Sequence, residues 1–200
     1  MMQNQLREIP TSKRYFPALL PIIGEEKYEQ IYKRYGGLYQ NHDLPKSSLL
    51  KWHLVEGILP GLALYQNLRE GGESQENALV VIDRTFEKLF SDIRTKMKKL
   101  GNFPWIYNVL RMYIKSAMRQ YPPEGWKLEW ILNDKNAVRF NMNSCFYYDT
   151  LVHYGAPGLT ISFCKVDNFI YGDMSRYVKW QRTMTIGRGD THCDFCFAHA

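Results

Sequence analysis

The stretch Trp126–Met142 reads WKLEWILNDKNAVRFNM and decides the fold class of the C-terminal part of the chain. Apolar residues recur at every second position over Trp126–Leu132 and again over Val138–Met142, which is the period of half-buried strands. The four residues Asn133–Asn136 between these two runs have the composition of a tight turn. The stretch therefore predicts an antiparallel β-hairpin.

Two helices are expected directly after this hairpin. Asn143 and Ser144 supply capping side chains for a helix over residues 145–154, which the glycines and proline of residues 155–158 end. Thr160 is placed to cap a second helix that reaches about Tyr171.

Two further strands are expected over residues 177–186 and 192–199. The order strand, strand, helix, helix, strand, strand predicts a four-stranded antiparallel sheet with helices packed on a face.

The chain upstream of the hairpin has mostly helical periodicity. Pro60-Gly61 should break one of the helices into a pair, and Tyr121–Gly125 (YPPEG) marks the change to strand periodicity. We expect an α+β fold in a single domain over residues 1–200, with a helical part over 1–122 and the α+β part over 123–200. The candidate helices cover residues 25–40, 47–70, 75–100 and 104–120.

Composition excludes several classes of protein. A chain of 200 residues with 45% hydrophobic content can bury one substantial core. The net charge of +6 favours anionic ligands mildly, but the basic residues of Arg94–Lys99 share their predicted helix with the acidic residues Asp83, Glu87 and Asp92, as on a solvated helix face. No nucleic-acid-binding motif accompanies them, so a nucleic-acid partner is not expected.

The start of the chain, Met1–Arg14, lacks the build of a signal peptide. The longest apolar runs, Phe16–Ile23 and Ala78–Ile82, are too short to span a bilayer. We expect a cytoplasmic protein without a membrane partner. Its four cysteines are then free thiols, metal ligands or catalytic groups rather than disulfides.

Two of these cysteines lie on the expected helices. Cys145 falls in a first turn, where the helix dipole can lower the pKa of a thiol below about 8.5, although a small buried hydrophobic role also fits. Cys164 and Asp167 are three residues apart, so their side chains share one helix face.

The segment Gly187–Phe197 reads GRGDTHCDFCF and combines thiols, carboxylates and an imidazole. Cys193 and Cys196 form a CxxC, but in a strand they point to opposite faces and cannot easily chelate one ion or pair with each other. Cys193 shares the face of Phe195, and Asp194 the face of Cys196.

Arg182 and Thr185 precede this segment on the partner strand. An arginine can clamp a carboxylate through two parallel hydrogen bonds, although an ordinary surface position is the alternative for Arg182.

Four short motifs, taken in order, resemble the L-2-amino-thiazoline-4-carboxylic acid hydrolase family. They are Cys145–Tyr148 (CFYY), Phe163–Asp167 (FCKVD), Arg182–Gly187 (RTMTIG) and His192–Phe195 (HCDF). The resemblance covers about residues 140–197, with weaker support from Ile58–Tyr65. It implies the hydrolytic opening of a five-membered 2-aminothiazoline ring to an N-carbamoyl amino acid.

Under this resemblance we expect Cys164 to be the nucleophile and Asp167 its acid/base neighbour. Cys193 and Asp194 would complete the wall of the site, beside Cys145. The expected substrate is a small molecule with a carboxylate, and no cofactor or metal is expected. Four residues are expected to bind it, with Arg182 as the carboxylate anchor: Arg182, Thr185, His192 and Tyr148.

Two alternatives stay open. Cys145, Cys164 and Cys193 with Asp167 or His192 would suit a tetrahedral zinc site, more readily a structural than a catalytic one. The other is a small-molecule-binding or sensor module with a cysteine-lined pocket, because the expected architecture also resembles ligand-sensing domains of the four-vinyl-reductase type.

Overall fold

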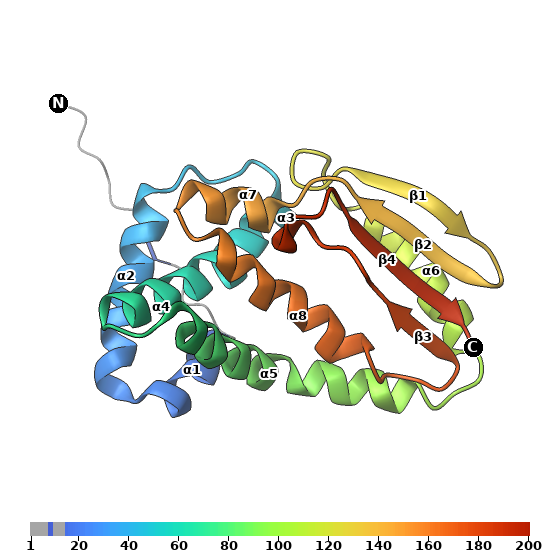
Figure 1. Ribbon diagram of the computed structural model, residues 1–200, viewed down its shortest axis with the longest axis horizontal. Helices are drawn as coiled ribbons and strands as arrows, with labels where there is room; N and C mark the ends of the chain where they lie inside the picture. The colour runs from blue at the N-terminus through green and yellow to red at the C-terminus, as the bar shows by residue number, and fades with distance from the viewer. Residues whose placement is uncertain (1–7, 10–14) are drawn as a thin grey trace. The chain divides into compact units, whose positions relative to one another are not determined.

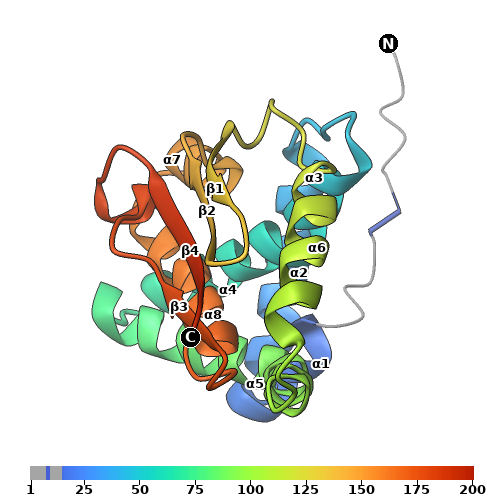
Figure 2. The same ribbon diagram turned by 90° about the vertical axis from the view of Figure 1, so that its right-hand side faces the viewer.

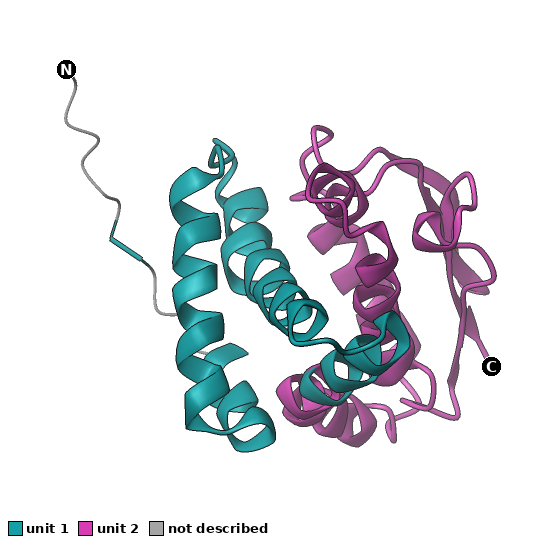
Figure 3. Ribbon diagram, turned by 60° about the vertical axis from the view of Figure 1, so that its left-hand side comes forward, with its two compact units in different colours: residues 1–85 teal, residues 86–200 magenta. Residues whose placement is uncertain are grey.

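The computed structural model describes residues 8–9 and 15–200 of the chain. Most of Met1–Arg14, where no signal peptide is expected, lies outside the described residues. The chain divides into two compact units, Met1–Thr85 and Phe86–Ala200, which Figure 3 colours separately. The boundary falls inside a helix, and the expected single domain stays a prediction.

The first unit is helical, with its core formed by aliphatic and tyrosine side chains such as Tyr35, Leu54 and Leu62. The stretch expected over residues 47–70 is helical without a gap from Ser48 to Glu70, so the break expected at Pro60-Gly61 is only a change of helix type, with Pro60 as the second residue of the helix Leu59–Glu70. Its missing N–H leaves a wider turn just before it, in which Leu59 N–H bonds to the Leu54 carbonyl. The elements are α1 (Tyr15–Ile23), α2 (Glu25–Asn41), α3 (Ser48–His53), a π-helix (Leu54–Ile58), α4 (Leu59–Glu70) and the start of α5 (Gln75–Leu100).

The second unit contains the end of α5, α6 (Ile106–Met118) and the α+β part of the chain. α5 is tied to the segment after α8 (Thr160–Tyr171) because Arg94 and Lys98 both pair with Asp173. A Cβ atom on Gly101 would lie 1.8 Å from the Met174 carbonyl oxygen, so only glycine allows the chain to approach so closely there.

The sheet has four antiparallel strands in the order β1-β2-β4-β3 (Figure 1). The Asp134 carboxylate closes the β1–β2 turn by accepting hydrogen bonds from the amides of Asn136 and Ala137. This arrangement confirms the α+β fold and the order of elements expected from the sequence. The elements are β1 (Leu128–Asn133), β2 (Ala137–Met142), α7 (Phe146–His153), α8, β3 (Val178–Gln181) and β4 (Cys193–His199).

Each face of the sheet meets a helix. On one face Trp180 donates a hydrogen bond to Asn168 of α8, and Phe197 packs on Tyr171. At the other face lies α6 (Figure 2). Its Tyr107 hydroxyl donates a hydrogen bond to the Asp134 carbonyl in the β1–β2 turn and comes near Cys196. On the α8 side of the sheet, Trp180 and Arg182 both bond to polar side chains of α8.

The strand expected over residues 177–186 is shorter than predicted and ends at Gln181. Beyond it the Asp194 carboxylate binds the amides of Thr183 and Met184, and Asp190 binds the amide of Thr185. These carboxylates take the place of strand partners, and the chain turns into a 3₁₀ helix at Ile186–Arg188.

Two predicted caps are also wrong. Ser144 accepts a hydrogen bond from the amide of Lys127, so Cys145 becomes the N-cap of α7. Thr160 is the first residue of α8 rather than its cap, because a 3₁₀ turn over Pro157–Leu159 leads directly into the helix.

Within the described residues, no helix has both the length and the apolar character needed to cross a bilayer.

Candidate functional site

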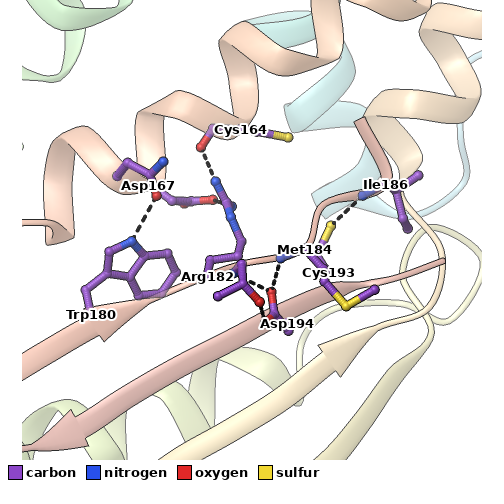
Figure 4. Close-up of polar contacts among 10 residues, drawn as sticks. Cys164, Asp167, Trp180, Arg182, Met184, Ile186, Cys193 and Asp194 are labelled. Atoms are coloured by element: carbon purple, nitrogen blue, oxygen red, sulfur yellow. Dashed lines mark hydrogen bonds and ion pairs between the residues drawn. The ribbon is translucent and has the colours of Figure 1, made fainter. Parts of the chain in front are cut away.

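One face of α8 carries a row of three chemically active side chains, Thr160, Cys164 and Asp167. Their spacing of four and then three residues brings them onto a single helix face. Arg182, from the segment after β3, reaches this face (Figure 4). The row and the arginine define the candidate site.

Arg182 is the most deeply buried charge of the site, with 3% of its side chain exposed. Its Nη1 lies 2.7 Å from Oδ2 of Asp167, and its Nη2 donates to the main-chain carbonyl of Cys164. The guanidinium carbon lies 5.7 Å from the ring centre of Trp180 and 5.4 Å from that of Phe195. These contacts exclude the surface position that was the alternative for Arg182 and hold the guanidinium against α8.

Asp167 lies in dense surroundings but keeps 35% of its side chain exposed. Burial raises the pKa of its carboxyl group above the usual range, and the charge and hydrogen bond of Arg182 act in the opposite direction. Asp167 is therefore a recessed carboxyl group that still meets solvent, as a proton carrier in a site requires.

Three of the four cysteines gather at this site. Burial raises the pKa of Cys145 to about 12 and that of Cys164 to about 11, and it raises the pKa of Cys193 as well. Cys193 raises the pKa of both other thiols by electrostatic repulsion, and Cys164 raises that of Cys145, so the three thiols lie within electrostatic range of one another. The structure thus brings together Cys145, Cys164 and Cys193 from three separate elements.

Of the two roles open for Cys145 in the sequence, the structure favours the buried thiol over the thiol with a lowered pKa. The amides of Tyr148 and Tyr147 at the start of α7 do lower it, but desolvation of the buried thiol is the larger effect. A helix terminus lowers the pKa of a thiol appreciably only where the resulting thiolate is also solvated or paired.

Cys193 and Cys196 point to opposite faces of β4, as strand parity predicts. Cys193 accepts a hydrogen bond from the Ile186 amide at 3.4 Å, on the α8 side. Cys196 lies opposite Arg139 and Gln181 in the ladder, with its sulfur 4.0 Å from Gln181 Oε1. All four cysteines are free thiols.

The Asp194 carboxylate binds the segment that follows β3. Its carboxylate accepts hydrogen bonds from the amide and hydroxyl of Thr183 and from the amide of Met184, at 2.6 to 2.8 Å. Burial alone would raise the pKa of Asp194, but these hydrogen bonds lower it below the usual range. The group is a fixed anion that holds the segment carrying Arg182.

The remaining predicted residues differ in their distance from the thiols. The Thr185 hydroxyl is near enough to lower the pKa of Cys164. Tyr148 contributes through its amide beside Cys145. The His192 ring bonds to Thr191 at 3.0 Å, and among the contacts of the described residues none joins it to the cysteines.

Gly187 and Thr160 belong to the site but were not predicted as part of it. A Cβ atom on Gly187 would lie 3.0 Å from Cγ2 of Thr160 and 3.3 Å from the sulfur of Cys164. The signal for Thr160 was its spacing of four residues from Cys164, whereas nothing in the sequence marks Gly187 as the neighbour of this thiol.

No group of three or more histidine, cysteine, aspartate or glutamate side chains among residues 8–9 and 15–200 is arranged to hold a metal ion.

Residues 53–197 match the model of the L-2-amino-thiazoline-4-carboxylic acid hydrolase family. The chain belongs to this family. Membership confirms the family that the four motifs of the sequence resemble. The name of the family implies a hydrolase. The matched range includes the three clustered thiols, Asp167 and Arg182.

No curated protein sequence matches the chain significantly. A solved structure that does match is an H-NOX domain from Shewanella oneidensis in its Fe(II)CO ligation state. It is 10% identical, the alignment covers 92% of this chain and 97% of the other, and the TM-score is 0.33. A likeness this distant has no bearing on the activity of the hydrolase family member.

Proposed function

We propose that the protein opens the five-membered ring of a 2-aminothiazoline-4-carboxylate by hydrolysis and releases an N-carbamoyl amino acid. The observation that carries the proposal is the meeting of three thiols with the Asp167–Arg182 ion pair, in a chain that belongs to this hydrolase family. Chemistry at one carbon between a sulfur and two nitrogens needs a nucleophile and a proton carrier side by side, and Cys164 and Asp167 meet that need.

The charges of the site suit such a substrate. The ring carries a basic amidine and a carboxylate, and the site offers the carboxylate of Asp167 and the guanidinium of Arg182. Arg182 already donates to Asp167 and to the Cys164 carbonyl, so a substrate carboxylate has to share the guanidinium with Asp167. Sharing weakens the pairing of Asp167 with Arg182 and raises the pKa of the Asp167 carboxyl group, so that its carboxylate takes up a proton more readily during the reaction.

In the first step the Cys164 sulfur attacks the ring carbon between sulfur and nitrogen, and Asp167 accepts the thiol proton. The carbon–sulfur bond of the ring breaks, and Asp167 returns the proton to the departing sulfur. The product of this step is an isothiourea that joins Cys164 to the opened substrate, which now carries a free thiol.

In the second step water adds to the same carbon and gives up a proton to Asp167. The bond to Cys164 breaks, Asp167 returns the proton to the cysteine sulfur, and the product leaves as an N-carbamoyl amino acid. The two steps together consume one water molecule and need no oxidant or metal.

The other predicted residues take supporting roles in the proposal. Cys145 and Cys193 line the site beside Cys164, and Tyr148 lies next to Cys145 on α7. Asp194 keeps Arg182 in place through its bonds to Thr183 and Met184, which makes it a positioning residue rather than a proton carrier. The His192 ring bonds to Thr191, so His192 is assigned no step in the proposed reaction.

A binding or sensor module is the second candidate. The observation in its favour is that burial raises the pKa of all three thiols, so they are un-ionised near neutral pH and can contact a ligand without reacting. Such a module would bind the ring compound and leave it intact.

Incubation of the purified protein with 2-amino-2-thiazoline-4-carboxylate distinguishes the hydrolase from the binding or sensor module. The hydrolase should release one new thiol for each molecule consumed, with a product heavier by one water in the mass spectrum. Binding without thiol release would favour the module. Consumption without a new thiol would show that the carbon–nitrogen bond breaks, which contradicts the first step.

A further inference from the structure

Two buried hydroxyl groups beside Cys164 have no hydrogen-bond partner. Thr160 is 0% exposed and Thr185 is 4% exposed, and the Oγ1 atom of each is without a partner among the described residues. A buried hydroxyl group without a partner costs free energy, and proteins generally satisfy such groups through neighbours, water or ligands.

Both hydroxyl-bearing residues lie around the same sulfur atom. Gly187, two residues after Thr185, packs against Thr160 and Cys164, so that an added Cβ would meet both the methyl group of Thr160 and the thiol. The Thr185 hydroxyl acts on the Cys164 thiol directly, although the contact lacks ordinary hydrogen-bond geometry. The two threonines come from α8 and from the segment after β3, so two separate parts of the chain contribute to the surroundings of this thiol.

The chemistry of the proposed reaction leaves one substrate group without an assigned partner. The ring carboxylate pairs with Arg182, and the attacked carbon faces Cys164. The exocyclic amino group on that carbon carries two N–H bonds and needs acceptors next to the sulfur. Threonine oxygens accept such bonds.

We infer that Thr160 and Thr185 are specificity-determining residues, whose hydroxyl groups receive the exocyclic amino group of the ring substrate beside Cys164. The inference rests on the proposed function. It predicts that the site distinguishes ring compounds with this amino group from those without it, because an unfilled pair of buried hydroxyl groups penalises the analogue.

Two aromatic ring compounds that resist hydrolysis test this directly. 2-Aminothiazole-4-carboxylate has the amino group, and thiazole-4-carboxylate lacks it. Titration calorimetry on the full chain should show that the wild type prefers the amino compound. Thr185→Val and Thr160→Val keep the side-chain shape, and each should reduce that preference about tenfold while leaving the affinity for thiazole-4-carboxylate unchanged.

The chain offers two controls. Ser162 is 1% exposed and its Oγ also lacks a partner, but it lies about 200° around α8 from both Thr160 and Cys164. Ser162→Ala should therefore keep the preference for the amino compound. Thr185→Ser, which restores the hydroxyl group, should recover it.

The possible failures differ. A wild type that binds neither compound would overturn the proposed function and the inference together. A preference for the amino compound that survives in both valine variants would overturn the inference alone and leave water as the partner of these hydroxyl groups. Equal weakening of both compounds in the valine variants would likewise overturn it, because the threonines would then act through packing.

Discussion

Burial governs the acidity of Cys164 more strongly than its charged neighbours do. The Arg182 guanidinium and the Thr185 hydroxyl both lower the pKa of this thiol, yet desolvation raises it to about 11. Near neutral pH the thiolate is therefore a minor species, and a neighbouring base has to take the proton during reaction. The proposed mechanism assigns this step to Asp167, which lies on the same helix face.

Alkylation of Cys164 should report this acidity without any substrate. Its rate with iodoacetamide, followed by mass spectrometry of the Cys164 peptide, should rise about tenfold for each pH unit between pH 7 and pH 10, because the thiolate fraction below a pKa grows in that proportion. The unfolded protein is the control, and its rate should reach half of its plateau near pH 8.5, at about the pKa of a free thiol. A folded-state rate that levels off below pH 9 would contradict the burial argument.

Sequence patterns predicted which side chains of the candidate site lie together better than they predicted the pKa values and ion pairs of those side chains. Helix spacing places Cys164 with Asp167, and strand parity separates Cys193 from Cys196, because both follow from local geometry. The pKa of Cys145 and the pairing of Arg182 with Asp167 depend on which surfaces the fold buries, which local spacing does not determine.

At the level of the elements, Asp194 replaces strand pairing with side-chain hydrogen bonds. Its carboxylate holds the amides of Thr183 and Met184, so the backbone leaves the ladder after Gln181 and carries Arg182 toward α8. This also explains why alternation in the sequence predicts too long a strand there. The hairpin at Trp126–Met142 was predicted well because its turn is closed by its own residue Asp134.

Asp194→Ala should destabilise the fold by about 1 to 3 kcal/mol, the usual cost of losing hydrogen bonds to a charged group. Urea unfolding at pH 7 measures this. Asp173→Ala is the control, because Asp173 is 53% exposed and its ion pairs with Arg94 and Lys98 should contribute at most about 1 kcal/mol.

The pH dependence of this effect has a definite sign. Hydrogen bonding lowers the pKa of Asp194, so its contribution is present above about pH 4, where the unfolded group titrates, and is lost as the pH falls further. The difference between the wild type and Asp194→Ala should therefore shrink below pH 4. Equal urea midpoints for the wild type and Asp194→Ala at pH 7 would contradict a stabilising role for the Asp194 carboxylate.

In the molecule as a whole, the change from helices to the α+β part was predicted from the YPPEG segment, and α6 ends at Met118 before β1 begins at Leu128. The helix α1 was not among the predicted helices, since its apolar run is short and contains Pro21. The division into two units inside α5 has no marker in the sequence, because helical periodicity continues through Thr85 and Phe86.

The purified protein should carry no stoichiometric zinc. The basis is that Cys193 and Cys196 face opposite sides of β4 and cannot act as a chelating pair, while Asp167 is already bonded to Arg182. Elemental analysis decides the matter. The contradicting result is about one zinc per chain, where a chelator removes both the zinc and the activity and added zinc restores both. The thiols would then be zinc ligands, and a metal-bound water would be the attacking group.

The central claim is that the thiols between α8 and the sheet perform the reaction, and alanine substitution tests it most directly. Turnover of 2-amino-2-thiazoline-4-carboxylate should fall at least 100-fold in Cys164→Ala, the range that loss of a nucleophile gives, and clearly in Cys193→Ala. Cys196→Ser, on the opposite face of β4, should keep wild-type turnover. Near-wild-type turnover in both Cys164→Ala and Cys193→Ala would contradict the account.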